Sequence, residues 1–244
     1  GRSCCVCLRA CTNCNCVTWS RFWFSSSSVL ERSTPGDKRK MGRHVGAPVP
    51  EDDWERVQAL RSLSLLDTPE EDSFSRITDC CAQVFGVPIA LVSLVDTDRQ
   101  WFKAKCGLSA CQTSRDLAFC AHAILQRESR VFLVEDATQD ERFKYSDLVL
   151  GPPHIRFYAG APLVWQGHKI GTVCVIDTKP RELTASLQQK LIKLAALAAG
   201  HMHTRLQARQ LQEANAALQL QTERLHALID TADAPEETCQ DVRG

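Results

Sequence analysis

The stretch FYAGAPLVWQGHKIGTVCVID, residues 157–177, holds two apolar runs on either side of a short polar break. The break is Gln166-Gly167-His168, and glycine adopts the backbone angles of a tight turn more readily than other residues do. The flanking runs are rich in β-branched and aromatic residues, which favour strands. The stretch therefore predicts a β-hairpin, that is, two antiparallel strands.

A second hairpin is predicted upstream, in VPIALVSLVDTDRQWFKAKCG, residues 87–107. The first run alternates with a period of two, yet both alternating sets are largely apolar, so we expect this strand to be covered on both faces. The polar residues 96–99 supply the turn, and residues 100–106 return as the second strand. Two hairpins in one chain indicate a sheet that is mainly antiparallel.

Helical spacing of apolar residues is clear in two segments before the first strand, 54–66 and 70–85. Thr68 and Glu71 have the spacing of a capping box, which predicts that the second helix begins at Pro69. After the upstream hairpin we expect a loop over 107–116, a short helix over 117–128, a strand over 131–136 and a long loop with one helical turn. Helices packed on an antiparallel sheet make an α+β domain, which we place at 51–183.

From 184 to 230 the periodicity is helical throughout, and its second half follows a heptad. Leu211, Leu218 and Leu225 fall at d positions, and Asn215 falls at an a position, where asparagine fixes the register of parallel dimers. We therefore expect a coiled-coil-like helix that forms a homodimer. The polar tail 231–244 and the Cys/Ser-rich leader and linker 1–50 are expected to be disordered.

Composition excludes several classes of protein. Lys+Arg and Asp+Glu both number 29, so the net charge is zero, and nothing indicates binding to nucleic acid or to an anionic membrane. No apolar run approaches the roughly 18 residues of a membrane span. The scattered cysteines behave as small hydrophobes of a reducing compartment, which indicates the cytoplasm. The cysteines of the first 16 residues include a C-x-x-C pair, Cys11 and Cys14, so a zinc knuckle or a targeting leader both stay open there.

Five segments in order resemble a GAF domain of the signalling type found beside histidine kinases and diguanylate cyclases. They are ERVQALRSLSLLDTPEEDSFSRIT, VPIALVSLVDTDRQWFKAKCGL, SRDLAFCAHAI, VEDATQDERF and FYAGAPLVWQGHKIGTVCVIDTKPRELT, and they span roughly residues 54–200. The resemblance implies an antiparallel sheet of five or six strands with helices on both faces, and pairing through the flanking helices. GAF domains as a class bind cyclic nucleotides, tetrapyrroles, haem or small acids, so the ligand or cofactor stays open. Gln112 stands where related domains often carry glutamate, which puts a salt-bridging role there in doubt.

The segment LAFCAHAI, residues 117–124, is the centre of the candidate site. Cys120 and His122 are two residues apart, and on a helix such positions project about 200° apart, which argues against a catalytic dyad. We interpret Cys120 as lining a small-molecule pocket between the sheet and residues 106–160, and His122 as a polar group that contacts the ligand there. Core packing of both residues is the alternative. Ala121 separates the two, whereas histidine directly follows the cysteine that carries a bilin in related photoreceptors. The proposed ligand-binding residues are Trp101, Arg115, Phe119, Cys120, His122, Asp136, Phe143 and Tyr158.

The predicted function is that of a non-catalytic sensory domain that relays its ligand state through the C-terminal helix. Arg115 is expected to pair with Asp116, Asp136 or a ligand anion. Phosphate-binding, metalloprotease and serine-hydrolase motifs are missing from the sequence, and so are kinase and cyclase signatures, so we expect no enzyme, no metal site and an output module elsewhere. Two alternatives stay open: a free methionine sulfoxide reductase that uses Cys106, Cys111 and Cys120, and a ligand-free dimerisation module.

Overall fold

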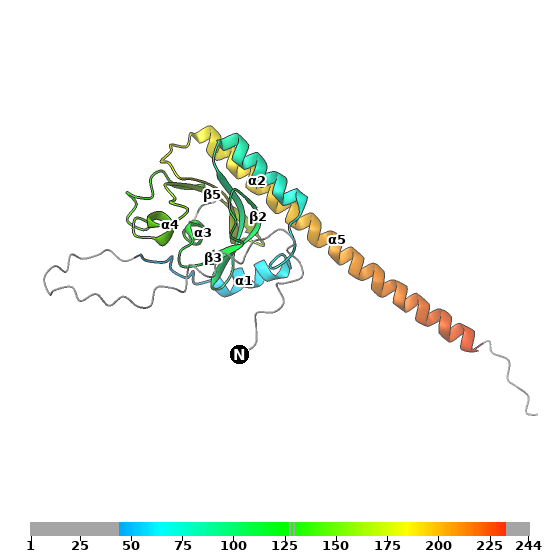
Figure 1. Cartoon of the computed structure of the whole chain (residues 1–244). Helices are drawn as coiled ribbons and strands as arrows, with labels where there is room; N and C mark the ends of the chain where they lie inside the picture. Colours follow the sequence, from blue (N-terminus) through cyan, green and yellow to red (C-terminus); the bar gives the residue numbers. More distant parts are fainter. Residues whose placement is uncertain (1–43, 127, 129, 233–244) are drawn as a thin grey trace, which may run out of the picture. The chain divides into compact units, whose positions relative to one another are not determined.

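The computed structural model describes residues 44–232 except 127 and 129 (Figure 1). The predicted leader 1–50 and tail 231–244, including the N-terminal C-x-x-C pair, lie almost wholly outside these residues. Within the described part no helix has the length and the apolarity that crossing a membrane requires. The chain divides into two compact units between Met202 and His203.

The elements follow one another as two helices, two long strands, a short strand, a short helix, a short strand, a short helix, two long strands and a long helix. Their bounds are α1 Asp53–Ser62, α2 Asp72–Phe85, β1 Ile89–Val95, β2 Arg99–Cys106, β3 Gln112–Ser114, α3 Phe119–Ala123, β4 Phe132–Val134, α4 Asp147–Leu150, β5 Phe157–Trp165, β6 His168–Asp177 and α5 Ala185–Ala232. The six strands form one antiparallel sheet in the order β3-β2-β1-β6-β5-β4. The predicted α+β fold is confirmed.

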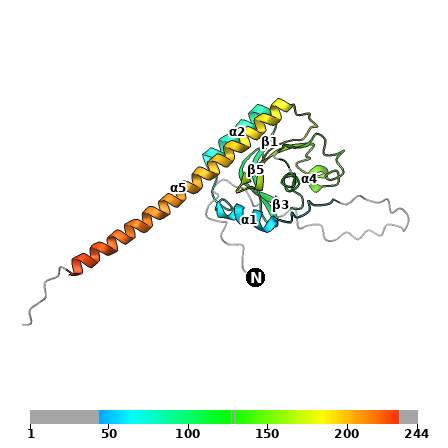
Figure 2. The ribbon, with the colours of Figure 1, turned by 180° about the vertical axis from the view of Figure 1, so that it is seen from behind.

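Helices cover both faces of the sheet. In the views of Figures 1 and 2, α2 and the first part of α5 lie side by side on one face, and α3 and α4 lie on the other. The ring of Phe74 on α2 meets the ring of His201 on α5 edge-on at 6.2 Å between centroids. All seven residues of β1 are buried, as its two apolar faces predict.

The β5–β6 hairpin supplies β6, which lies between β1 and β5 in the sheet, and its turn fixes the register of β5 against β6. Gln166 and Gly167 both have positive φ, 49° and 83°, which is the signature of a two-residue turn that matches the twist of its strands. Trp165 pairs with His168, and the ladder runs back to Phe157 opposite Asp177. A Cβ on Gly171 would stand 2.0 Å from the carbonyl oxygen of Ser93 on β1, so only glycine allows this approach of β6 to β1.

Several predicted boundaries were wrong. The helix predicted over 54–66 ends at Ser62, the helix predicted over 117–128 spans only 119–123, and part of the predicted loop 107–116 forms β3.

The capping box was also wrong, because α2 begins at Asp72 and Glu71 caps it without a side-chain bond. Thr68 and Glu71 instead bind the ammonium group of Lys103, which is fully buried on β2. A buried charge requires such partners, so Thr68 and Glu71 bind Lys103 instead of capping the helix.

Candidate functional site

The helix α3 carries three of the predicted site residues and is buried along its whole length, Phe119–Ala123. It follows a tight turn in which the amide of Ala118 donates to the carbonyl of Arg115 at 3.0 Å. Its apolar side chains pack against β1, β5 and β6, together with residues of the loop that carries α4. A helix of five residues has no stability of its own in water, so this packing is what keeps it folded.

Three of the predicted aromatic residues meet at α3. The ring of Phe119 stacks on Phe143 at 3.9 Å between centroids and 12° between planes, and on Tyr158 at 5.2 Å. Phe143 comes from the loop before α4, and Tyr158 comes from β5. All three are buried, so their own side chains fill the space between α3, the sheet and the loop.

The thiol of Cys120 points from α3 to the sheet and lies in a small polar cluster. Its Sγ accepts hydrogen bonds from the hydroxyls of Tyr158 and Thr172, each at 3.1 Å, and lies 3.9 Å from the Sγ of Cys174. Burial raises the pKa of the Cys120 thiol, but the hydrogen bonds from Cys174, Thr172 and Tyr158 outweigh it and lower that pKa overall. The sequence reasoning missed Thr172 and Cys174, although the register of the hairpin turn points both toward this face.

The imidazole of His122 lies on another side of α3 and is only 9% exposed. Its ring meets Phe143 edge-on at 4.8 Å, and its Nε2 is buried with no hydrogen-bond partner. Burial lowers the pKa of His122 to about 4, and the nearby charge of Arg142 adds to the effect. His122 is therefore a neutral ring with one unused hydrogen-bonding nitrogen at neutral pH.

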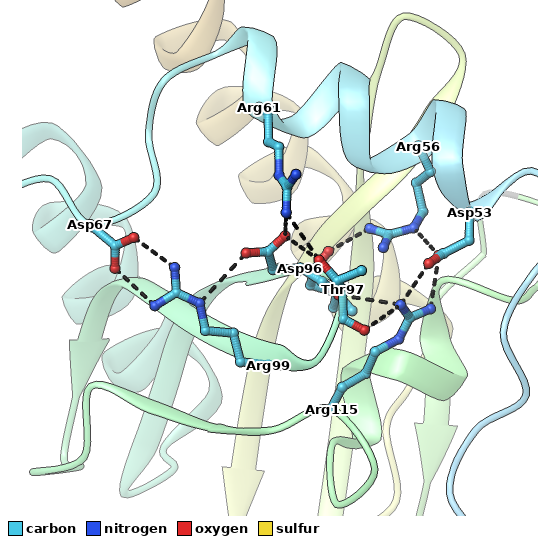
Figure 3. A network of polar contacts seen from close by, with 9 residues as sticks. Asp53, Arg56, Arg61, Asp67, Asp96, Thr97, Arg99 and Arg115 are labelled. Atoms are coloured by element: carbon cyan, nitrogen blue, oxygen red, sulfur yellow. Dashed lines mark hydrogen bonds and ion pairs between the residues drawn. The ribbon is translucent and has the colours of Figure 1, made fainter. Parts of the chain in front are cut away.

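Arg115 takes part in a buried network of ion pairs, drawn in Figure 3. Its guanidinium holds both carboxylate oxygens of Asp53 at 2.7 and 2.8 Å, and Arg56 contacts the same carboxylate at 2.7 Å. Arg115 also donates to the carbonyls of Asp96 and Thr97 in the β1–β2 turn. The predicted pairing of Arg115 with Asp116 or Asp136 was wrong, because its partner is Asp53 on α1.

The two remaining predicted residues lie apart from α3. Trp101 is on β2 next to Phe102, and Phe102 belongs to the apolar cluster on the α3 side, so strand alternation directs Trp101 to the opposite face. Asp136 follows β4, where its carboxylate accepts from the amide and the hydroxyl of Thr138 at 2.9 and 2.7 Å. The structure thus brings together Phe119, Cys120, His122, Phe143 and Tyr158 but leaves out Trp101 and Asp136.

A hollow of about 380 Å³ lies on the other face of the sheet, between α2 and the first part of α5. Its lining mixes the apolar side chains of Ile77, Leu194 and Leu197 with the polar ends of Asp72 and Arg76.

Among residues 44–126, 128 and 130–232, no three histidine, cysteine or acidic side chains gather as a metal site would require.

The heptad residues lie on the second half of α5, in the unit that begins at His203. Leu211, Leu218 and Leu225 are 54–62% exposed, and Asn215 is exposed as well. Three large apolar side chains at heptad spacing therefore face solvent in the single chain.

Comparison with known proteins gives consistent results. A family model, GAF domain, matches residues 69–202. A cyclic di-GMP phosphodiesterase of Pseudomonas aeruginosa is 42% identical over 159 residues, which is 64% of this chain and 27% of that protein, so the chain spans about a quarter of that relative.

Solved structures share the fold at low identity. A bacteriophytochrome from the photosynthetic bacterium R. palustris matches with a TM-score of 0.51 and 13% identity over 77% of this chain and 43% of its own. A free methionine-R-sulfoxide reductase from Neisseria meningitidis matches with a TM-score of 0.47 and 15% identity, over 69% of this chain and 99% of its own. Similarity at this level of identity concerns the fold alone.

Proposed function

The chain belongs to the GAF family of sensory and regulatory domains, and from that premise we propose that it senses a small molecule at α3 without catalysing a reaction. The observation that carries the proposal is the Nε2 of His122, buried and without a hydrogen-bond partner. Leaving such a group unsatisfied costs roughly 1–3 kcal/mol. A ligand that offers one hydrogen-bonding group to this nitrogen recovers that free energy, which favours a binding role over plain packing.

The surroundings of His122 define the chemical class of the ligand. The imidazole is neutral and meets the ring of Phe143, on which Phe119 stacks, and the charges of Arg142 and Asp140 lie near enough to shift the pKa of His122. We therefore propose a small, mostly apolar molecule with one hydrogen-bonding group. Since these rings now pack together, binding requires them to part, and a short helix such as α3 moves more easily than a strand. The ligand then shifts the population toward the opened arrangement of α3.

The second half of α5 is the proposed relay. Its exposed seam, Leu211, Asn215, Leu218 and Leu225, suits a parallel homodimer, which would also bury the apolar side chains. Similarity to the cyclic di-GMP phosphodiesterase supports an output that turns over a cyclic dinucleotide, alongside the kinase or cyclase outputs expected from the sequence. A change in the packing of the two helices would carry the state of α3 to that output.

The thiols favour this function over a sulfoxide reductase. A reductase needs an accessible thiolate with a second thiol nearby. Burial raises the pKa of Cys106, and the nearby carboxylate of Asp79 raises it further. Cys120 is 1% exposed, so a substrate as large as free methionine sulfoxide does not reach its sulfur while α3 is closed. The close packing around α3 also suits a ligand-free dimerisation module, and the unpartnered nitrogen of His122 is what favours a sensor instead.

Native mass spectrometry tests both halves of the proposal in one experiment. We expect the wild-type chain, incubated with a small-molecule extract of bacterial cells, to form a dimer with a bound mass that is absent from His122→Phe. Leu218→Asp is expected to yield monomers, whereas Leu220→Asp, an exposed leucine outside the heptad seam, is expected to stay dimeric. A monomeric wild type would overturn the relay, and equal binding by wild type and His122→Phe would overturn the sensing site.

A further inference from the structure

Two buried thiols lie side by side between α3 and the sheet. The Sγ atoms of Cys120 on α3 and Cys174 on β6 are 3.9 Å apart, and both residues are at most 1% exposed. Both are free cysteines, and 54 positions separate them in sequence. A disulfide bond is about 2.05 Å long, so a small approach of α3 to β6 joins them.

The surroundings make the two thiols unequal. Cys120 accepts two O–H hydrogen bonds, from Tyr158 and Thr172, which stabilise its thiolate. Burial raises the pKa of Cys174 well above its ordinary value, and the hydrogen bond to Cys120 and the charge of Cys120 raise it further. Cys120 is thus the thiol that reacts first, and Cys174 is the thiol that resolves the product.

We propose that Cys120 and Cys174 form a reversible dithiol that peroxides oxidise to a disulfide between α3 and β6. In the first step the Cys120 sulfur attacks one peroxide oxygen and the O–O bond breaks, which leaves a sulfenic acid on Cys120 and releases water or an alcohol. In the second step the Cys174 sulfur attacks the sulfenic sulfur, the S–O bond breaks, and water leaves. The two thiols lose two electrons and the peroxide gains them.

The position of α3 gives this bond a structural consequence. Five residues of helix are held to the sheet by packing and by the two hydroxyl bonds to Cys120, so we expect α3 to open locally more readily than the long strands do. Such opening admits a molecule as small as hydrogen peroxide, and larger disulfide oxidants stay outside. Once formed, the bond ties α3 to the central strand β6 and prevents that opening. This inference concerns the thiols themselves and does not depend on the ligand proposed above.

Peptide mapping tests the proposal on the full chain. Trypsin releases Cys120 within residues 116–127 and Cys174 within residues 170–181, and each peptide holds no other cysteine. After hydrogen peroxide treatment, alkylation and digestion we expect these two peptides to be cross-linked, with the mass of two hydrogens lost, and to separate on reduction. Exchange of the α3 amides with deuterium is expected to slow in the oxidised chain.

Variants assign the order of the steps. Cys174→Ala is expected to stop at a Cys120 sulfenic acid that dimedone traps, Cys120→Ala is expected to leave Cys174 reduced, and Cys80→Ala at an exposed site is expected to keep the cross-link. Peptide 106–115, which holds Cys106 and Cys111, reports in the same digest whether nearby half-buried thiols pair instead. Oxidation of Cys80, Cys106 or Cys111 while Cys120 and Cys174 of the wild type stay reduced would overturn the proposal, whatever the variants do.

Discussion

Two groups of buried polar side chains hold this domain together in opposite ways. The α1 network, Asp53 with Arg56 and Arg115, consists of full charges in bidentate contact. The α3 cluster, Cys120 with Tyr158 and Thr172, consists of two hydroxyls that each donate to the same sulfur at 3.1 Å. Charged hydrogen bonds are roughly twice as strong as neutral ones, and a charge left alone in the interior is far more costly than a hydroxyl.

This difference assigns a separate task to each group. Burial raises the pKa of Asp53, but the bonds from Arg115 and Arg56 outweigh it, so the carboxylate stays ionised between two guanidinium groups. The network fixes α1, the β1–β2 turn and the start of the α3 segment in one frame. The α3 cluster is joined by two hydroxyl bonds to one sulfur and by no ion pair among its members, so α3 can shift within that frame at a smaller cost in free energy than the α1 network would allow.

The largest predicted effect comes from breaking the α1 network. Asp53→Ala leaves Arg56 and Arg115 buried without their counter-charge, and we expect the free energy of unfolding to fall by about 3–5 kcal/mol. Asp72→Ala is the matched control, because Asp72 also begins a helix but its side chain is 94% exposed and lies 3.9 Å from Arg76. Urea unfolding followed by circular dichroism measures both. A loss below about 1 kcal/mol for Asp53→Ala would show that the network does not hold the frame.

A smaller effect is predicted for His122 as the pH falls. The ordinary histidine pKa is 6.5, and burial lowers that of folded His122 to about 4. Between these values the unfolded chain binds the proton more tightly, so stability is full above pH 6.5 and declines toward pH 4, by roughly 2–3 kcal/mol. His122→Phe is expected to flatten this part of the pH profile of unfolding free energy, and His226→Phe on an exposed position of α5 is expected to leave it unchanged. An equal slope in wild type and His122→Phe would contradict a buried neutral ring.

Patterns local in the chain predicted most of the fold. Apolar runs with polar turns, at residues 96–99 and at Gly167, predicted both hairpins, and the two hairpins predicted the antiparallel sheet. Boundaries failed where a distant residue decided them. Lys103 is the clearest case, because nothing near it in the sequence indicates that it is buried and takes the side chain of Glu71 away from the helix cap.

The same distinction explains the site. Phe119, Cys120 and His122 share one short helix, so their proximity follows from the sequence, and the turn register adds Tyr158. The partner of Arg115 could not be predicted, because Asp53 approaches it only through the packing of α1 on the sheet. Three-dimensional packing, with no signal in spacing or composition, selects such pairs.

The smallest predicted effect tests the α3 cluster itself. Tyr158→Phe removes one hydroxyl and keeps the ring, and we expect a loss of about 1 kcal/mol in the free energy of unfolding, because one hydroxyl hydrogen bond to sulfur disappears. Tyr145→Phe, at a tyrosine that is 39% exposed, is the matched control and is expected to change nothing measurable. Since the lost O–H also stabilised the Cys120 thiolate, Tyr158→Phe is expected to raise the Cys120 pKa and slow its reaction with peroxide. A stability loss as large as that of Asp53→Ala would mean that the α3 cluster holds α3 as firmly as the ion pairs hold α1, and the two groups would then not differ in their tasks.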